Sequence, residues 1–159
     1  MSTTPRIRVL LVDDEQQFVE VVAERLENRG ISVNVAFDGR QALARLADAD
    51  PPQVVVLDLT MPGMDGLEVL ERIKAVDPLI EVVILTGKAT LASAVEAIRR
   101  GAFDYLMKPC DIDYLMGRIG EAAARRGRRE AKIREVQTTP YISDREREER
   151  IARILSLDR

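Results

Sequence analysis

Short apolar runs that end in a polar residue are the clearest pattern in this sequence. Three of them consist of valine, leucine and isoleucine, at 9–12, 54–57 and 82–85, and a fourth covers 105–107. They are followed by Asp13, Asp58, Thr86 and Lys108, respectively. Continuous aliphatic runs of this length indicate strands buried on both faces, as in a parallel sheet. Because the strands of such a sheet end at one edge, we expect the four polar side chains to lie together there.

Helical patterns alternate with the strands. We expect strands at 8–12, 32–36, 53–58, 81–86 and 103–107, with helices at 15–29, after Asp38-Gly39, before Asp77-Pro78, at 91–100 and after Pro109. Gly30 and Gly101 follow two of these helices as C-terminal caps. Five such units with right-handed crossovers predict an α/β fold, a doubly wound five-stranded parallel sheet of the flavodoxin-like order 2-1-3-4-5.

Each helix is expected to turn one apolar face toward the sheet, with positions spaced three or four apart. The first helix offers Phe18, Val21, Val22 and Leu26. The third helix offers Leu67, Leu70, Ile73 and Val76.

Charge divides the chain near Arg125. Residues 1–124 hold 13 basic and 20 acidic residues, whereas 125–159 hold 11 and 7, which accounts for the totals of 24 and 27. We therefore expect a disordered N-terminus at 1–5, one domain at 6–125 and a helical tail at 126–159 that forms no independent domain. In the tail, Ser143 and Glu146 suggest a capping box before a helix that presents Ile151, Ile154 and Leu155. So short a helix is marginal alone, so it should pack on the body or on a partner.

Composition narrows the class of protein. The sequence is 46% hydrophobic and 32% charged, and it contains neither a membrane-length apolar stretch nor a signal peptide. Its one cysteine, Cys110, can form no internal disulfide, so we expect a cytoplasmic protein without membrane contact. Histidine is absent, which excludes histidine-ligated metals and a phosphohistidine on this chain.

The acids at the expected sheet edge require a counter-charge. Asp13, Asp14 and Asp58 would lie within a few ångströms, and two carboxylates about 4 Å apart repel by roughly 4 kcal/mol at an effective dielectric of about 20. Oxygen ligands alone favour Mg²⁺, Mn²⁺ or Ca²⁺, and Mg²⁺ suits an open site that also binds phosphate.

Lys108 and Thr86 complete a site for a phosphoryl group. The proline after Lys108 allows a cis peptide bond that would aim the lysine into the crevice. The ammonium suits a phosphoryl oxygen or a carboxylate, and the Thr86 hydroxyl can donate to a phosphoryl oxygen. The predicted chemistry is phosphoryl transfer to Asp58, which would give an acyl phosphate.

Four stretches together resemble the receiver domain of two-component response regulators. They are Leu11-Val12-Asp13-Asp14-Glu15, the run from Asp58 to Gly66, Leu85-Thr86-Gly87, and the run from Phe103 to Pro109. The resemblance spans about 6–125, and the fourth helix is most similar to receivers of nitrogen-control regulators.

The resemblance implies a role for each site residue. Asp58 would accept phosphate from a sensor histidine kinase or phosphotransfer protein. Asp14, Asp58 and the Thr60 carbonyl would ligate Mg²⁺, with Asp13 supporting. Lys108 would contact the phosphate, and Thr86 and Tyr105 would form the switch that remodels the face of helix four, strand five and helix five for a downstream protein partner.

Other functions remain open at this point. A phosphatase of the haloacid-dehalogenase type needs an acid two residues after its nucleophile, where this chain has Thr60. A constitutive interaction module would leave the acidic site vestigial.

The tail could contact DNA through its arginines, which are Arg125, Arg126, Arg128 and Arg129. The interleaved glutamates favour a solvated or partner-binding helix instead. An extended fifth helix would also suit a homodimer, and the absence of a second core after 125 indicates a stand-alone receiver or a fragment.

Overall fold

A five-stranded parallel sheet forms the centre of the molecule. The computed structural model describes residues 5–157, so the expectation of disorder at 1–5 falls, Pro5 apart, outside the described residues. The strands are β1 (Arg8–Val12), β2 (Ser32–Ala36), β3 (Val54–Leu57), β4 (Glu81–Thr86) and β5 (Asp104–Met107). Their order is β2-β1-β3-β4-β5 and every pairing is parallel, which confirms the predicted fold class.

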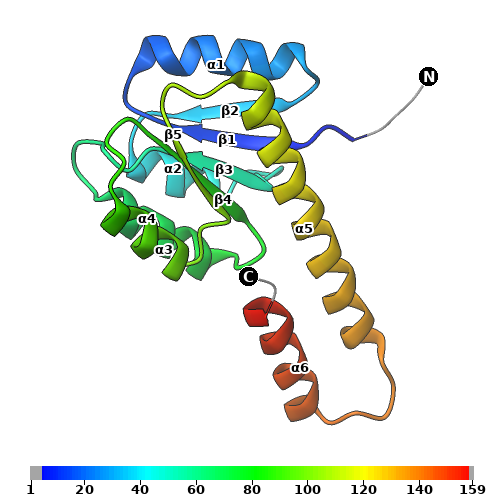
Figure 1. The fold of residues 1–159 in the computed structure, drawn as a ribbon. Coiled ribbons are helices and arrows are strands. Elements are labelled where there is room, and N and C mark those ends of the chain that lie inside the picture. The colour runs from blue at the N-terminus through cyan, green and yellow to red at the C-terminus, as the bar shows by residue number, and fades with distance from the viewer. Residues whose placement is uncertain (1–4, 158–159) are drawn as a thin grey trace.

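Helices cover both faces of this sheet (Figure 1). They are α1 (Gln16–Asn28), α2 (Gly39–Arg45), α3 (Gly66–Val76), α4 (Leu91–Arg99), α5 (Ile112–Thr138) and α6 (Asp144–Leu157). Alternate residues of β1 show the division: Leu10 and Val12 join the core under α2, α3 and α4, and Val9 and Leu11 join the core under α1 and α5. The sheet is thus buried on both faces, as the apolar runs predicted.

Two valines expected in the core are exposed. Val21 is 50% exposed and Val76 is 64% exposed. The buried stripe of α1 is Val19, Val22 and Leu26, with spacings of three and four residues. Successive helical residues are rotated by about 100°, so Val21 turns away from the face on which Val22 lies. In α3 the buried positions are Gly66, Val69, Leu70 and Ile73, and Val76 is the last residue of the helix, so it lies at the end of the buried stripe rather than on another face.

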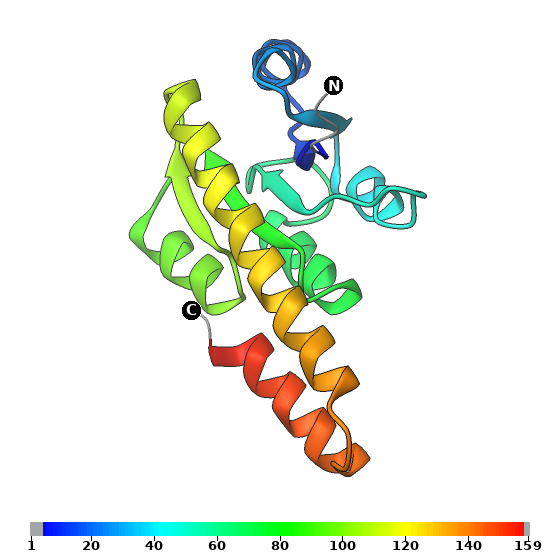
Figure 2. The same ribbon diagram turned by 90° about the vertical axis from the view of Figure 1, so that its right-hand side faces the viewer.

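The tail is an antiparallel helical hairpin that continues the domain. The α5 helix runs unbroken through Gly127 for 27 residues, and α6 returns alongside it (Figure 2). The Ser143 hydroxyl accepts a hydrogen bond from the Glu146 amide, 3.1 Å long, which is one half of the expected capping box. The Arg147 side chain donates to carbonyl oxygens at the C-terminal end of α5, which ties the two helices together. None of the helices in 5–157 is both long and apolar enough to cross a membrane.

The tail arginines were expected to be solvated or to bind a partner, and for Arg129 this expectation is wrong. Its side chain is 2% exposed and donates to the Glu81 carboxylate at 2.6 Å and to the Leu155 carbonyl at 2.7 Å. Arg125 reaches the same carboxylate at 3.3 Å. Glu81, the first residue of β4, is completely buried, and a carboxylate removed from water requires such cationic partners.

Candidate functional site

The carboxyl ends of β1 and β3 bring the three predicted acids together. Asp13 and Asp58 follow these paired strands and are 1% and 2% exposed, whereas Asp14 is exposed. One carboxylate oxygen from each lies within 4.8 Å of the others. All donors are oxygens, so the cluster fits a hard divalent cation such as Mg²⁺ or Mn²⁺.

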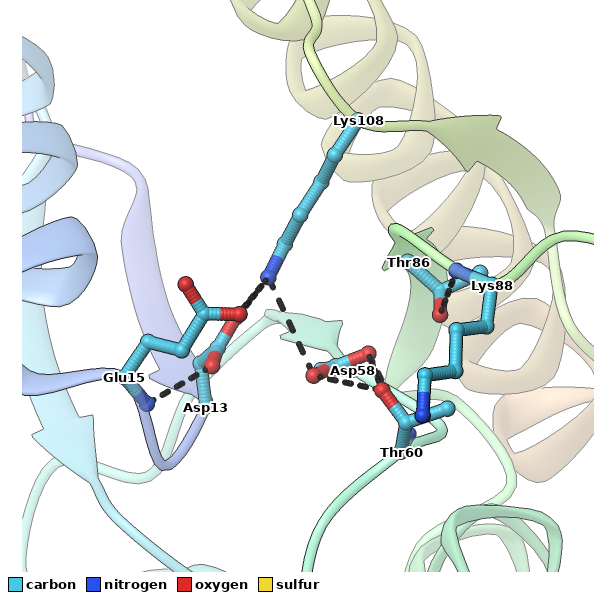
Figure 3. Close-up of polar contacts among 7 residues, drawn as sticks. All are labelled: Asp13, Glu15, Asp58, Thr60, Thr86, Lys88 and Lys108. Carbon is cyan, nitrogen blue, oxygen red and sulfur yellow. Dashed lines mark hydrogen bonds and ion pairs between the residues drawn. The ribbon is translucent and has the colours of Figure 1, made fainter.

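Lys108 enters this cluster from the end of β5 (Figure 3). Its Nζ lies 2.6 Å from Asp13 Oδ2 and 3.8 Å from Asp58 Oδ2. The Lys108–Pro109 peptide bond is cis, as the sequence allowed. The structure thus brings Lys108 and the acids together, as predicted from the strand ends.

Burial affects the pKa values of both Asp13 and Lys108. It raises the pKa of the Asp13 carboxyl, and the hydrogen bond from Lys108 offsets only part of the effect. Burial also opposes the charged form of Lys108, but the hydrogen bond to Asp13 and the charges of Asp13 and Asp58 outweigh it, so the pKa of Lys108 is raised. Lys108 therefore stays cationic, and its single positive charge faces the three clustered carboxylates and also Glu15, a balance that a divalent cation would complete.

Thr60 holds Asp58 from the loop between β3 and α3. Its amide and its hydroxyl donate to Asp58 Oδ1 at 3.2 and 3.1 Å, and the hydroxyl also lies 3.3 Å from Oδ2. A hydroxyl in this position orients the carboxylate but cannot serve as the second acid that a phosphatase of the haloacid-dehalogenase type needs.

Thr86 and Tyr105 lie on the neighbouring strands β4 and β5. Thr86 is completely buried, and its hydroxyl accepts a hydrogen bond from the Lys88 amide at 3.4 Å. Figure 3 shows the Lys88 side chain running from there toward Thr60. The Tyr105 hydroxyl lies 2.6 Å from the Ser93 hydroxyl of α4, so Tyr105 links β5 to α4. The two residues predicted as a switch pair thus flank the sheet edge without touching Asp58 in any described contact.

Two residues that contact Lys108 were not predicted from the sequence as part of the site. Glu15 approaches Lys108 Nζ with Oε1 at 3.4 Å, and its amide donates to Asp13 Oδ1 at 3.0 Å. The Lys108 ammonium also lies 4.1 Å from the centre of the Phe18 ring, a cation–π contact. Phe18 had been assigned to the core only, because helical periodicity does not reveal which core residue borders a site.

Gly66 permits the loop beside Asp58 to close against α3. A Cβ at this position would lie 2.5 Å from the Leu59 Cα and 3.0 Å from the Asp58 carbonyl oxygen. Gly66→Ala is therefore expected to lower the free energy of unfolding by about 1–3 kcal/mol, measured by urea denaturation. Gly117→Ala is the matched control, because Gly117 is helical and nothing lies within 4 Å of its Cβ position. The control should raise stability by up to about 1 kcal/mol, and an equal effect of both changes would contradict the close approach.

The fold and the residues at the carboxyl end of the sheet define the class of protein. It is an α/β domain whose strands end at a site formed by acids and a lysine. Residues 9–120 match the response regulator receiver domain, and the chain belongs to this family.

Relatives and solved structures agree with this assignment. The chain is 43% identical over 112 residues to an NtrX-like response regulator of Rickettsia bellii, covering 69% of this chain and 23% of that protein. It is 40% identical over 114 residues to the DNA-binding transcriptional regulator NtrC of Salmonella typhimurium, covering 72% and 24%. The receiver domain of NtrX from Brucella abortus superimposes with a TM-score of 0.69 at 38% identity, covering 73% of this chain and 98% of that one. The chain thus spans about a quarter of the length of these two curated relatives.

Proposed function

We propose that this chain is a phosphorylation-dependent switch in which Asp58 accepts a phosphoryl group with the help of Mg²⁺. Membership of the receiver family supports phosphorylation-dependent signalling in general. The observation that carries the specific proposal is the convergence of three carboxylates within 4.8 Å, with the Lys108 ammonium 3.8 Å from Asp58. Signalling domains of this family are not classical enzymes, so the reaction proposed is the chain's own modification.

The chain's residues divide the chemistry among them. An Asp58 carboxylate oxygen attacks phosphorus, the bond from phosphorus to the donor nitrogen breaks, and that nitrogen takes a proton from solvent. Lys108 exchanges part of its contact with Asp13 for a phosphoryl oxygen, and the Thr86 hydroxyl donates to another. Mg²⁺, or Mn²⁺, would be held by Asp13, Asp14, Asp58 and the Thr60 carbonyl. The bound ion would neutralise negative charge on the transferred phosphoryl group.

Phosphorylation would act through Thr86 and Tyr105. A phosphoryl group adds roughly −1.5 to −2 charges and three acceptor oxygens beside Asp58. Movement of Thr86 toward it would open space beside β4, into which Tyr105 can turn once it releases Ser93. That exchange would alter how α4 packs on β5. The phosphoryl group can shift the equilibrium between the two arrangements of Thr86 and Tyr105 only by the difference in its affinity for them.

The face formed by α4, β5 and α5 is the proposed surface for partners. Leu91, Val95 and Ile98 of α4 are 83%, 51% and 42% exposed. Met107 of β5, the strand that Tyr105 links to α4, is 62% exposed. This surface would take a downstream protein or a second copy of the chain. Because the chain has no histidine, a phosphohistidine donor must be another molecule, and the proposed donor is a sensor kinase or phosphotransfer protein.

Acetyl phosphate tests the proposed reaction without a kinase. Incubation with acetyl phosphate and Mg²⁺ should add the mass of one phosphoryl group, and EDTA should prevent this because three acids would then lack their counter-cation. Intact-protein mass spectrometry is the measurement. No mass increase with Mg²⁺ would instead favour a constitutive interaction module with a vestigial acidic site.

A further inference from the structure

A cavity of about 360 Å³ lies at the amino end of the sheet, opposite the acidic edge. It is bounded by the end of α3, the turn between α4 and β5, the middle of α5 and the end of α6. Figures 1 and 2 both show the C-terminal end of α6 beneath the domain, close to these elements. We name this cavity the basal pocket, and its size is within the range of small-molecule sites.

Among residues 5–157, the basal pocket is lined by four cations and by no acidic side chain. The cations are Lys74, Arg100, Arg125 and Arg129. Behind them, the single carboxylate of Glu81 is shared between Arg125 and Arg129. Arg100 pairs with Glu96 at 2.8 Å and with Glu71 at 3.5 Å, two acids that lie outside the lining. An anion entering the pocket would therefore meet positive charge on several sides.

Two of these cations retain unused donors. The Lys74 ammonium donates to the carbonyl oxygens of Pro78 and Ile80 at 2.7 and 2.8 Å, its only hydrogen-bond partners within 5–157. An ammonium has three N–H donors, so one remains for a ligand. The Nε of Arg129 is buried and has no hydrogen-bond partner among the described residues. A buried donor without an acceptor is unfavourable, and a bound anion would satisfy it.

The electrostatics agree with the geometry. Burial, together with the nearby charges of Arg129 and Arg125, lowers the pKa of Lys74 to about 8, although the charge of Glu81 acts in the opposite direction. The cations thus repel one another inside the protein, and a bound anion would relieve that repulsion.

The rest of the lining is apolar. Ile98, Ala102, Phe103 and Leu155 provide carbon surface beside the cations. A bare inorganic ion would leave this wall unused, whereas a ligand with a carbon skeleton would cover it.

We propose that the basal pocket binds a small organic phosphate, with the phosphate on Lys74, Arg100 and Arg129 and the carbon skeleton against Phe103 and Leu155. Such a ligand would join α6 to the domain, because Leu155 belongs to α6 and the other residues do not. The receiver would then carry a metabolite site at the edge opposite its phosphorylation site.

Titration with phenyl phosphate and with inorganic phosphate tests this proposal, because the two probes differ by one apolar ring. The full chain is titrated in EDTA, which keeps the probes from being held by metal at the acidic edge, and amide NMR signals are followed. We expect saturable shifts at residues 101–103, with a Kd for phenyl phosphate below about 1 mM and weaker binding of inorganic phosphate.

Two variants locate the binding. Lys74→Gln and, at the rim, Arg100→Gln should each weaken phenyl phosphate binding about tenfold or more. Lys88→Gln is the matched control, because Lys88 is an exposed lysine at the opposite edge. The proposal is overturned by an absence of saturable shifts at 101–103, by equal affinity for the two probes, or by equal loss in all three variants.

Discussion

Asp58→Asn is expected to abolish phosphoryl incorporation from acetyl phosphate while leaving the protein folded. Asparagine offers no carboxylate to attack phosphorus, although its side chain can keep the hydrogen bonds to Thr60. Asp50→Asn is the control, because Asp50 is an exposed acid in the loop before β3, and it should be phosphorylated like the parent. Intact mass after equal incubation distinguishes them, and phosphorylation of the Asp58 variant would transfer the proposed role to another residue.

The same substitution has an expected effect on stability that does not depend on phosphorylation. In EDTA, the three clustered carboxylates share the ammonium of Lys108 with Glu15, so removing one negative charge relieves repulsion. The thermal midpoint of the Asp58→Asn variant should rise by about 2–4 °C, which corresponds to about 1 kcal/mol for a chain of this size. Mg²⁺ should stabilise the parent more than the variant, because binding to the folded state alone raises stability. A lower midpoint in EDTA would mean that Asp58 supports the fold in another way.

Arg129→Ala is expected to cost about 3 kcal/mol of stability, the largest loss among the variants considered. The change removes the closer cation of the buried Glu81 and the hydrogen bond to the Leu155 carbonyl. Arg125 remains near Glu81 at 3.3 Å, which places the loss at the lower end of the range for a broken buried ion pair.

Arg128→Ala supplies the comparison for Arg129. Arg128 is the preceding residue on α5 and is exposed, so its truncation should change stability by less than about 0.5 kcal/mol. Urea unfolding of both variants measures the difference. If both variants lost the same free energy of unfolding, the buried contact of Arg129 with Glu81 would contribute no more to stability than an exposed arginine of the same helix.

The site could be predicted because topology gathers it. Asp13, Asp58, Thr86 and Lys108 each follow an apolar run, and a parallel sheet brings the ends of its strands to one edge regardless of details of packing. The helices on both faces follow from the same alternation, and the observed order of strands is the flavodoxin-like option for five such units. These features depend on local pattern and chain direction, which a sequence displays directly.

Features that depend on the rotation and reach of a helix could not be predicted. Val21 and Val76 fitted an apolar spacing, yet Val21 lies one step around α1 from the buried stripe, and Val76 lies at the exposed end of the stripe of α3. The contact of Phe18 with Lys108 depends on how α1 is rotated over the sheet. The pairing of Arg129 with Glu81 joins residues 48 positions apart and requires α5 to continue past the sheet at a particular angle.

The residue that carries the phosphoryl group is the most direct test of the proposed function. The parent chain is phosphorylated with acetyl phosphate and Mg²⁺ and reduced with borohydride, which converts an aspartyl phosphate to homoserine, and its peptides are then analysed by mass spectrometry. The account predicts homoserine at position 58 and unchanged aspartate at positions 13 and 14. Homoserine at either of those positions, or a phosphate that survives on a hydroxyl side chain, would contradict it.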